Sequence, residues 1–149
     1  MRAVITRVAS ASVSVDNQVV SEIGHGLLVL IGVENGDETA DIDHVAGKIK
    51  DLRIFSDSAG KMNLSVTDVG GAVLAVSQFT LVADVSRGRR PSFVRAAPPE
   101  PANAAYEGVV GRLREAGLVV KTGVFRADMQ VASVNDGPVT IWIDSRSDK

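Results

Sequence analysis

Apolar and polar residues alternate along the first part of the chain in the pattern of a half-exposed β-strand. Over residues 2–15, valines recur among polar side chains, and Ser10, Ser12 and Ser14 alternate with apolar neighbours. Short apolar runs bounded by Gly, Asn and Asp continue this pattern further along. It predicts further strands over residues 19–23, 27–33, 53–56, 72–78, 119–125, 129–135 and 139–143.

Two other stretches have the spacing of amphipathic helices. Over residues 42–52 and again over residues 102–113, apolar side chains recur every three or four positions, with charged residues between them. Pro99 or Pro101 suits the first turn of the second helix, and Gly117 is a suitable residue to end it. The pattern therefore predicts two helices, each with one buried face.

The order of these elements indicates an α+β fold. Many strands, few helices and no regular strand–helix alternation favour a largely antiparallel sheet, curled toward a barrel, with both helices on one side. Residues 1–149 form a single predicted domain. Residues 82–101 lack any period and are rich in Arg, Gly and Pro, which predicts a long surface loop. Residues 144–149 are polar and are expected to fray.

The amino-acid composition excludes several classes of protein and several kinds of site. With 45% hydrophobic and 23% charged residues, the chain is expected to fold as an ordinary globular domain. It has no cysteine, which excludes disulfides and thiolate sites and suits a cytoplasmic location. The N-terminus lacks the apolar core of a signal peptide, and no apolar run approaches the length of a membrane helix, so no membrane partner is expected. Because the net charge is −2, any RNA contact must come from a local basic patch.

The usual catalytic constellations are missing from the sequence. His25 lies between two glycines, and His44 falls on the polar side of the first predicted helix, so neither indicates a catalytic base or a metal ligand. There is no Gly-x-Ser-x-Gly motif and no phosphate-binding Gly-x-x-x-x-Gly-Lys loop. If the protein is a hydrolase, its rate must come mainly from positioning and from polar groups of the backbone and the substrate.

Two loop-like segments carry candidate polar chemistry. Residues 77–81 place two hydroxyls and an amide where a buried strand leaves the core, and they either line a cleft or satisfy backbone groups at the strand end. Residues 87–93 hold three arginines and a phenylalanine. These arginines either contact phosphates or are solvated surface charges.

Two further segments are open to more than one interpretation. Residues 135–140 read as a turn between two strands, and the sequence leaves the isomer of its X-Pro bond open. Phe125 and Met129 could hold a flat ring, although ordinary core packing explains an aromatic ring and a thioether equally well.

Together with other short motifs, these segments are similar to the D-aminoacyl-tRNA deacylase family, and the resemblance runs nearly end to end. The motifs are Arg7-Val8 with Ala11-Ser12-Val13, Gly26-Leu27-Leu28-Val29, Leu52-Arg53-Ile54-Phe55, Gly60-Lys61-Met62-Asn63, Ser77-Gln78-Phe79-Thr80-Leu81, Arg90-Pro91-Ser92-Phe93, Ala127-Asp128-Met129-Gln130-Val131 and Asn135-Asp136-Gly137-Pro138-Val139-Thr140. They occur in the order and at the distances that the family has.

The resemblance implies an enzyme that hydrolyses the ester of D-aminoacyl-tRNA, and glycyl-tRNA as well, in an obligate homodimer. Gly137-Pro138, as a cis peptide, would reach from one subunit into the active site of the other, and Arg7 would help to lock it. A rigid wall of backbone carbonyls would then exclude L side chains, so the site would proofread chirality by rejection.

The resemblance also implies the roles of the remaining site residues. Ser77, Gln78, Phe79 and Thr80 would line the facing wall, near the ester carbonyl. The border of the terminal adenosine would be formed by Ala102, Phe125 and Met129. The neighbouring ribose hydroxyl of the tRNA would assist hydrolysis. Thr80 as the nucleophile is a weaker alternative, because no neighbour evidently activates its hydroxyl.

The implied partners are the acceptor end of D-aminoacyl-tRNA and a second copy of the chain. No cofactor, metal ion or DNA partner is expected. Two rival interpretations are a module that binds the end of tRNA without turnover, and a small-molecule enzyme, such as a deaminase of reactive metabolites, with its site at a subunit interface of a β-rich oligomer. Intact ester after long incubation would favour the first rival, and indifference to tRNA would favour the second.

Overall fold

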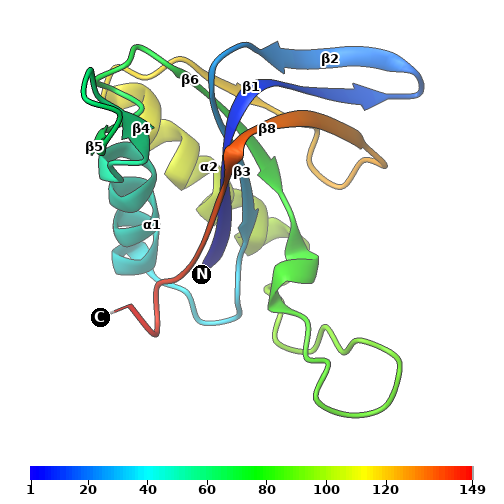
Figure 1. The fold of residues 1–149 in the computed structure, drawn as a ribbon. Coiled ribbons are helices and arrows are strands. Elements are labelled where there is room, and N and C mark those ends of the chain that lie inside the picture. Colours follow the sequence, from blue (N-terminus) through cyan, green and yellow to red (C-terminus); the bar gives the residue numbers. More distant parts are fainter. Residues whose placement is uncertain (149) are drawn as a thin grey trace.

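The sheet is organised around its first strand in a computed structural model that describes residues 1–148. Along one edge, β1 (Arg2–Val15) pairs antiparallel with β8 (Gln130–Asp144) over nearly its whole length. Along the other edge it pairs antiparallel with β2 (Gln18–Ile23) and β3 (Gly26–Gly32). Alternate side chains of β1 are buried, as its sequence pattern predicts. β1 therefore holds both halves of the sheet together (Figure 1).

The rest of the sheet is parallel. β3 pairs parallel with β6 (Ala72–Ser77), and β6 pairs parallel with β7 (Val120–Thr122). The hydroxyl of Ser21 in β2 donates a hydrogen bond to the carbonyl of Thr122 in β7. The sheet is thus mixed and curls until it is nearly closed, which confirms the barrel-like α+β prediction, while "largely antiparallel" describes only the pairings of β1. A separate hairpin joins β4 (Phe55–Ser56) to β5 (Met62–Leu64).

Both helices pack on one side of the sheet, as predicted (Figure 1). α1 (Thr39–Asp51) begins with a capping box in which the side chains of Glu38 and Asp41 each accept a backbone N–H. α2 (Pro99–Glu115) starts on proline, and Gly117 follows its end with a φ of +90°. None of the helices within residues 1–148 is long and apolar enough to cross a membrane.

Two apolar clusters form the core. The larger lies between the helices and the sheet and includes Phe55, Tyr106 and Leu113. The smaller lies within the curl of the sheet, where Val13, Leu74 and other side chains of β1, β3 and β6 meet. Each helix contributes the apolar face that its spacing predicts, and the strands β3 and β6 are buried nearly throughout.

The last part of the sheet differs from the prediction. Residues 129–135 and 139–143 belong to one continuous strand, β8, and the segment Asn135–Thr140 is a bend within it instead of a turn between two strands. The pairing of β8 with β1 shifts register near Val8, which accommodates this bend. Between residues 119 and 125, only β7 is a strand.

The polar segment after β8 is also more ordered than its composition suggests. Asp144 and Ser145 are buried, so the prediction that residues 144–149 fray is wrong for both. Arg2 Nε donates to Asp144 Oδ2 at 3.1 Å, and the hydroxyl of Ser145 donates to Asp41 at 2.7 Å. Specific polar partners elsewhere in the fold hold these residues, and composition alone does not reveal them. Lys149 lies outside the described residues.

Candidate active site

A polar cluster begins where β6 leaves the core. Strand β6 is buried up to Ser77, after which the chain turns into a short 3-10 helix, η1 (Phe79–Val82). The backbone N–H of Gln78 donates to the carbonyl of Ile31 at 2.7 Å, so the first residue after β6 is still held against β3. The side-chain amide of Gln78 donates to the hydroxyl oxygen of Thr80 at 2.6 Å. The polar groups predicted at this strand end are therefore fixed relative to one another.

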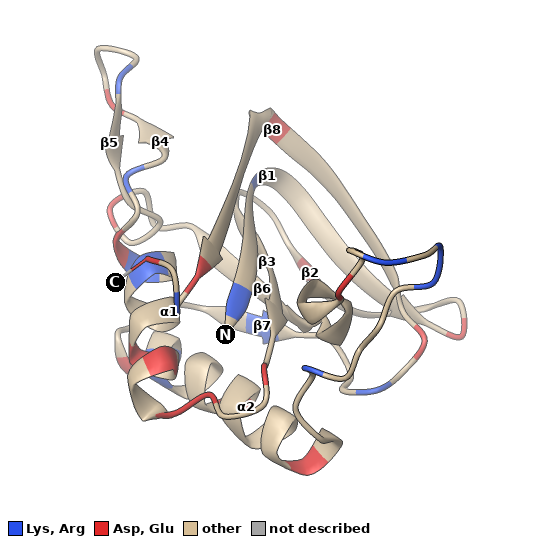
Figure 2. Ribbon diagram, turned by 90° about the horizontal axis from the view of Figure 1, so that it is seen from below, with Lys and Arg blue, Asp and Glu red and all other residues tan. Residues whose placement is uncertain are grey.

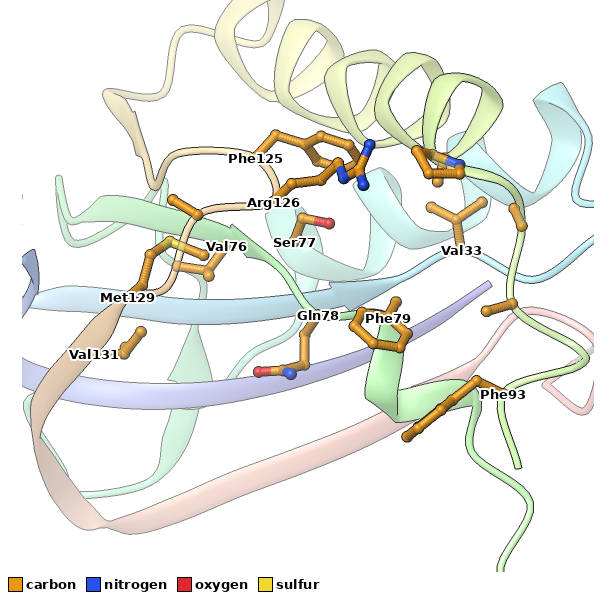
Figure 3. A pocket seen from close by; sticks show the side chains of 15 residues that line it. Val33, Val76, Ser77, Gln78, Phe79, Phe93, Phe125, Arg126, Met129 and Val131 are labelled. Atoms are coloured by element: carbon orange, nitrogen blue, oxygen red, sulfur yellow. The ribbon is translucent and has the colours of Figure 1, made fainter. Parts of the chain in front are cut away.

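These residues form one side of an open cavity of about 500 Å³ (Figure 3). Most of its wall is apolar, with the polar groups confined to a few positions. The lining side chains come from the residue after β3, from β6 and η1, from the loop before α2, from the first turn of α2, from the segment between β7 and β8, and from the start of β8. They are Val33, Val76, Ser77, Gln78, Phe79, Phe93, Ala96, Ala97, Pro99, Ala102, Phe125, Arg126, Ala127, Met129 and Val131.

An aromatic pair forms the wall on the helix side. The ring of Phe125 stacks on that of Tyr106, with centroids 6.5 Å apart and planes 29° apart. The hydroxyl of Tyr106 donates to the carbonyl of Ala75 at 2.8 Å, and the backbone N–H of Gly123 donates to the same carbonyl at 3.1 Å. Burial raises the pKa of Tyr106, so its hydroxyl remains a donor. The carbonyl of Ala75 thus ties α2 and the segment before Phe125 to β6.

Met129 lies over a glycine beside this wall. A Cβ atom on Gly123 would come within 2.8 Å of the sulfur of Met129, so a larger residue there would make the thioether shift. In Figure 3, Met129 and Phe125 approach the cavity from the same side. The fixed ring and the thioether together give the cavity a flat apolar surface of the kind that an aromatic ligand contacts.

The loop before α2 completes the opposite rim. Phe93 meets Phe79 edge to face, with ring centroids 5.0 Å apart. The backbone N–H of Ala97 donates to the carbonyl of Val33 at 3.0 Å. Arg95 forms an ion pair with Glu34, whose side chain is only 3% exposed. This buried carboxylate therefore anchors a loop that has no regular structure of its own.

The bend in β8 is a second ordered polar feature. The Gly137–Pro138 peptide is cis, as the resemblance implied. Arg7 Nε donates to the carbonyl of Asp136 at 2.8 Å, and Arg7 Nη1 donates to the carbonyl of Ile54 at 2.7 Å. The backbone N–H of Val139 donates to the side chain of Asn135 at 2.9 Å. Arg7 therefore spans from the bend to the chain just before β4.

Glycine is required at the centre of this bend. Gly137 has a φ of +144°, which L side chains rarely adopt. A Cβ atom there would lie 2.8 Å from Cγ2 of Val139 and 3.2 Å from Nη2 of Arg7. A larger residue would push away the guanidinium that holds the bend in place.

The structure brings some of the predicted site residues together and leaves others apart. Six of them line the cavity: Ser77, Gln78, Phe79, Ala102, Phe125 and Met129. Thr80 lies just beyond the lining, with its hydroxyl bonded to Gln78. Arg7, Gly137 and Pro138 are not part of the cavity wall within this chain. The two histidines lie elsewhere, His25 against the ring of Phe55 and His44 at 4.0 Å from Asp148.

Sequence reasoning missed several lining residues. Arg126 and Ala127 lie between Phe125 and Met129, so their position in the chain could have indicated them. No local pattern pointed to Val33 or to the alanines of the loop, because only tertiary structure brings the end of β3 against residues 95–97. Phe93 belonged to a recognised motif but was not assigned to the site.

The chain is similar in sequence to known proteins over nearly its full length. A D-aminoacyl-tRNA deacylase from Anaeromyxobacter dehalogenans (strain 2CP-C) is 62% identical over 146 residues, covering 98% of each chain. One from Thermomicrobium roseum (strain ATCC 27502 / DSM 5159 / P-2) is 57% identical and covers 97% of this chain and 94% of its own.

Two solved structures have a similar fold. The protein titled "c-Myc DNA Unwinding Element Binding Protein" superposes with a TM-score of 0.91 and 41% identity, covering 97% of this chain and 98% of its own. A probable eukaryotic D-amino acid tRNA deacylase superposes with a TM-score of 0.80 at 17% identity, covering 95% and 97%. A sequence profile described as "D-Tyr-tRNA(Tyr) deacylase" matches residues 4–144. Because this match spans most of the sequence and the relatives are similar over nearly their full length, the chain belongs to the D-Tyr-tRNA(Tyr) deacylase family.

Proposed function

We propose that this chain is a hydrolase that cleaves the ester bond of D-aminoacyl-tRNA, releasing the D-amino acid and free tRNA. The main support for the proposal is the cavity, in which a flat apolar wall lies opposite the polar residues at the end of β6. The terminal adenosine would lie against Phe125, Met129 and Ala102. The ester would then lie near Ser77 and Gln78, where the polar groups are.

The catalytic contribution of the protein is mainly positioning. No histidine or carboxylate lines the cavity among the described residues, so no side chain there is an evident general base. The first backbone amides of η1 have no partner inside that helix and are suited to stabilise the charge that develops on the ester carbonyl oxygen. The neighbouring ribose hydroxyl of the substrate would assist the attack.

Thr80 is better suited to orient groups than to attack. Its hydroxyl oxygen already accepts a hydrogen bond from the amide of Gln78, which occupies one of its two lone pairs and makes the oxygen less nucleophilic. No base is bonded to the hydroxyl in the described part of the chain. We therefore assign Thr80 to the wall near the ester and leave the nucleophilic role as the less favoured alternative.

We further propose that the enzyme is a homodimer whose site is completed across subunits. Residues 130–138 of β8 are all exposed, and the outer edge of this strand has no partner in the described sheet. An exposed edge strand of this length usually pairs or is covered. Val134 and Trp142 on β8 are more than half exposed. The bend at Gly137-Pro138 is rigidly held yet faces solvent, as a feature that enters another subunit's cavity would.

This arrangement would select the substrate by exclusion. The carbonyls around Gly137 and Pro138 would occupy the space into which an L side chain projects, whereas a D side chain would project away from them. Glycine has no side chain to be rejected, so glycyl-tRNA should also be cleaved. The role of such an enzyme would be chiral proofreading in translation, in the cytoplasm.

Basic residues on the loop before α2 would contact the tRNA backbone. The loop carries exposed Arg87, Arg89 and Arg90, and Figure 2 shows its blue segments extending away from the body of the protein. The described side chains of these three arginines have no ion-pair partner. Phosphates near the acceptor end are the expected partners, and binding should weaken with salt. DNA is not an expected partner, because the proposed site recognises an amino-acyl ester.

The deciding experiment compares release of amino acid from D-tyrosyl-tRNA and L-tyrosyl-tRNA, with wild type and Thr80→Ala. Rapid loss of the D ester alone is the expected wild-type result. A Thr80→Ala variant that remains active would indicate that backbone amides and the ribose hydroxyl of the substrate, and not the Thr80 side chain, promote hydrolysis. Intact D ester after prolonged incubation, together with retained tRNA binding, would instead identify a binding module without turnover. Failure to bind or cleave any charged tRNA would favour a small-molecule enzyme.

A further inference from the structure

One charged side chain lines the cavity. Among the described lining residues, only Arg126 carries a charge, and it is exposed. Its guanidinium makes no ion pair or hydrogen bond with any residue in the range 1–148. The backbone of Arg126 has a φ of +65°, an uncommon conformation for a residue with a side chain. Figure 3 shows its side chain running past Phe125 toward α2.

We propose that Arg126 binds the phosphate on the 5′ side of the terminal adenosine of the substrate. The inference rests on the proposed function, because it assumes that a nucleoside occupies the cavity. Phe125 and Arg126 are adjacent in the chain and both line the cavity, so a single nucleotide can place its base against the ring and its phosphate at the guanidinium (Figure 3). An unpaired guanidinium next to an aromatic surface is well suited to a group that joins a flat base to an anion.

The nearby helix end is a poor alternative site for an anion. α2 begins beside the cavity, but Pro99 and Pro101 have no backbone N–H and cannot donate hydrogen bonds. Glu100, between them, places a negative charge in the first turn. The usual attraction of a helix N-terminus for phosphate is therefore weak here, which leaves Arg126 as the cationic donor of the cavity.

The contact should be modest because Arg126 is exposed to solvent. A charge-assisted hydrogen bond in such a position typically changes affinity by about three- to tenfold. The contact lies at the far end of the nucleotide from the ester, so it should affect substrate binding and not the hydrolytic step. Arg126 would therefore be a binding residue and not a catalytic residue.

The test uses adenosine, adenosine 5′-monophosphate and adenosine 3′-monophosphate as probes, with affinities measured by NMR titration of the intact protein. Wild type should bind the 5′-monophosphate about three- to tenfold more tightly than adenosine. The 3′-monophosphate should show no such advantage, because its phosphate would occupy the ester end. Arg126→Gln should bind the 5′-monophosphate and adenosine equally. Lys121→Gln is the matched control, because Lys121 is exposed on β7, outside the cavity wall.

Three results would overturn the inference. The first is a wild type that does not prefer the 5′-monophosphate over adenosine. The second is a preference that survives in Arg126→Gln. The third is a preference that is lost equally in Lys121→Gln, which would indicate a general charge effect.

Deacylation kinetics separate this inference from the proposed function. With D-tyrosyl-tRNA, Arg126→Gln should raise KM without lowering kcat, and should reduce the slope of log affinity against log salt by about one. An active wild type with an unchanged KM in Arg126→Gln would contradict only the role of Arg126. An inactive wild type would contradict the proposed function itself.

Discussion

The cavity and the bend in β8 are both held by specific hydrogen bonds, but they differ in what they face. The cavity is lined by several segments of the same chain, and hydrogen bonds and ion pairs of Tyr106 and Glu34 hold two of them in place. The bend is fixed as firmly, by Arg7 and Asn135, yet Gly137 and Pro138 face solvent. A rigid feature with nothing opposite it in its own chain is suited to a partner outside the chain.

The largest effect on activity is expected when the bend in β8 loses the arginine that holds it in place. Arg7→Ala should free the bend and lower kcat/KM for D-tyrosyl-tRNA by about 100-fold, since small displacements of a positioning group have effects of this size. Arg7→Lys keeps the charge but cannot span the carbonyls of Asp136 and Ile54 together, so it should recover little of the loss.

Mixing variants tests whether the bend acts across subunits. A chain with a blocked cavity, Ala102→Trp, should be inactive alone but keep its own bend intact. Mixed in equal amounts with Arg7→Ala and refolded together, it should restore about a quarter of wild-type activity, from the one complete site in each mixed dimer. No recovery, with both variants folded by circular dichroism, would mean that the bend serves its own chain.

A smaller effect is expected at the anchor of the loop that rims the cavity. Arg95→Gln should lower the free energy of unfolding by about 2 kcal/mol, because it leaves the buried carboxylate of Glu34 with Arg146 as its remaining cationic partner. It should also raise KM by loosening the loop. Glu34→Ala should have a smaller effect on stability, because the half-exposed guanidinium of Arg95 that it leaves unpaired is solvated by water. Urea denaturation followed by the fluorescence of the single tryptophan measures both variants.

The wall behind Phe125 should respond more mildly. Tyr106→Phe removes one buried hydrogen bond, while the carbonyl of Ala75 keeps the bond from Gly123. We expect a loss of about 1 kcal/mol in the free energy of unfolding and a modest rise in KM. An unchanged stability would show that the hydroxyl contributes nothing to holding α2 against β6.

A further effect appears only in alkaline solution. Burial raises the pKa of Tyr106 above its usual value of 10.0, so the unfolded chain loses this proton before the folded chain does. The stability that depends on the neutral phenol is complete below about pH 10 and is lost as the pH rises toward the folded pKa. Tyr106 is the only tyrosine, so phenolate absorbance reports it alone. Tyr106→Phe should lack this loss of stability.

Local patterns predicted most of the fold but less of the site. Alternation in β1 and helical spacing in residues 42–52 were sufficient, because each element buries the face that its own sequence defines. The bend at Gly137-Pro138 looked like a turn, since Asn, Asp, Gly and Pro favour turns wherever they occur. Its place inside a strand depends on the register with β1, which is a long-range property.

The same limit applies to the cavity. Ser77 to Phe79 and Phe125 to Met129 were recognisable because their chemistry is local and unusual for strand ends. The ion pair between Glu34 and Arg95 could not be predicted, because nothing in the local sequence of either residue indicates a contact with a residue so far away in the chain. The sequence does not distinguish Arg126 from other arginines, because a single arginine is usually solvated, and its position in the cavity wall is visible only in the folded chain.

The pairing of the first strand with the last also has a consequence for biosynthesis. β1 leaves the ribosome well before β8, which covers one of its edges and cannot join it until residues 130–144 have been made. Until then that edge of β1 is open, and contacts so distant in sequence form slowly. The segment carrying Phe125 and the bend follow one another closely in the chain, so a nascent chain cannot complete its cavity much before it completes β8.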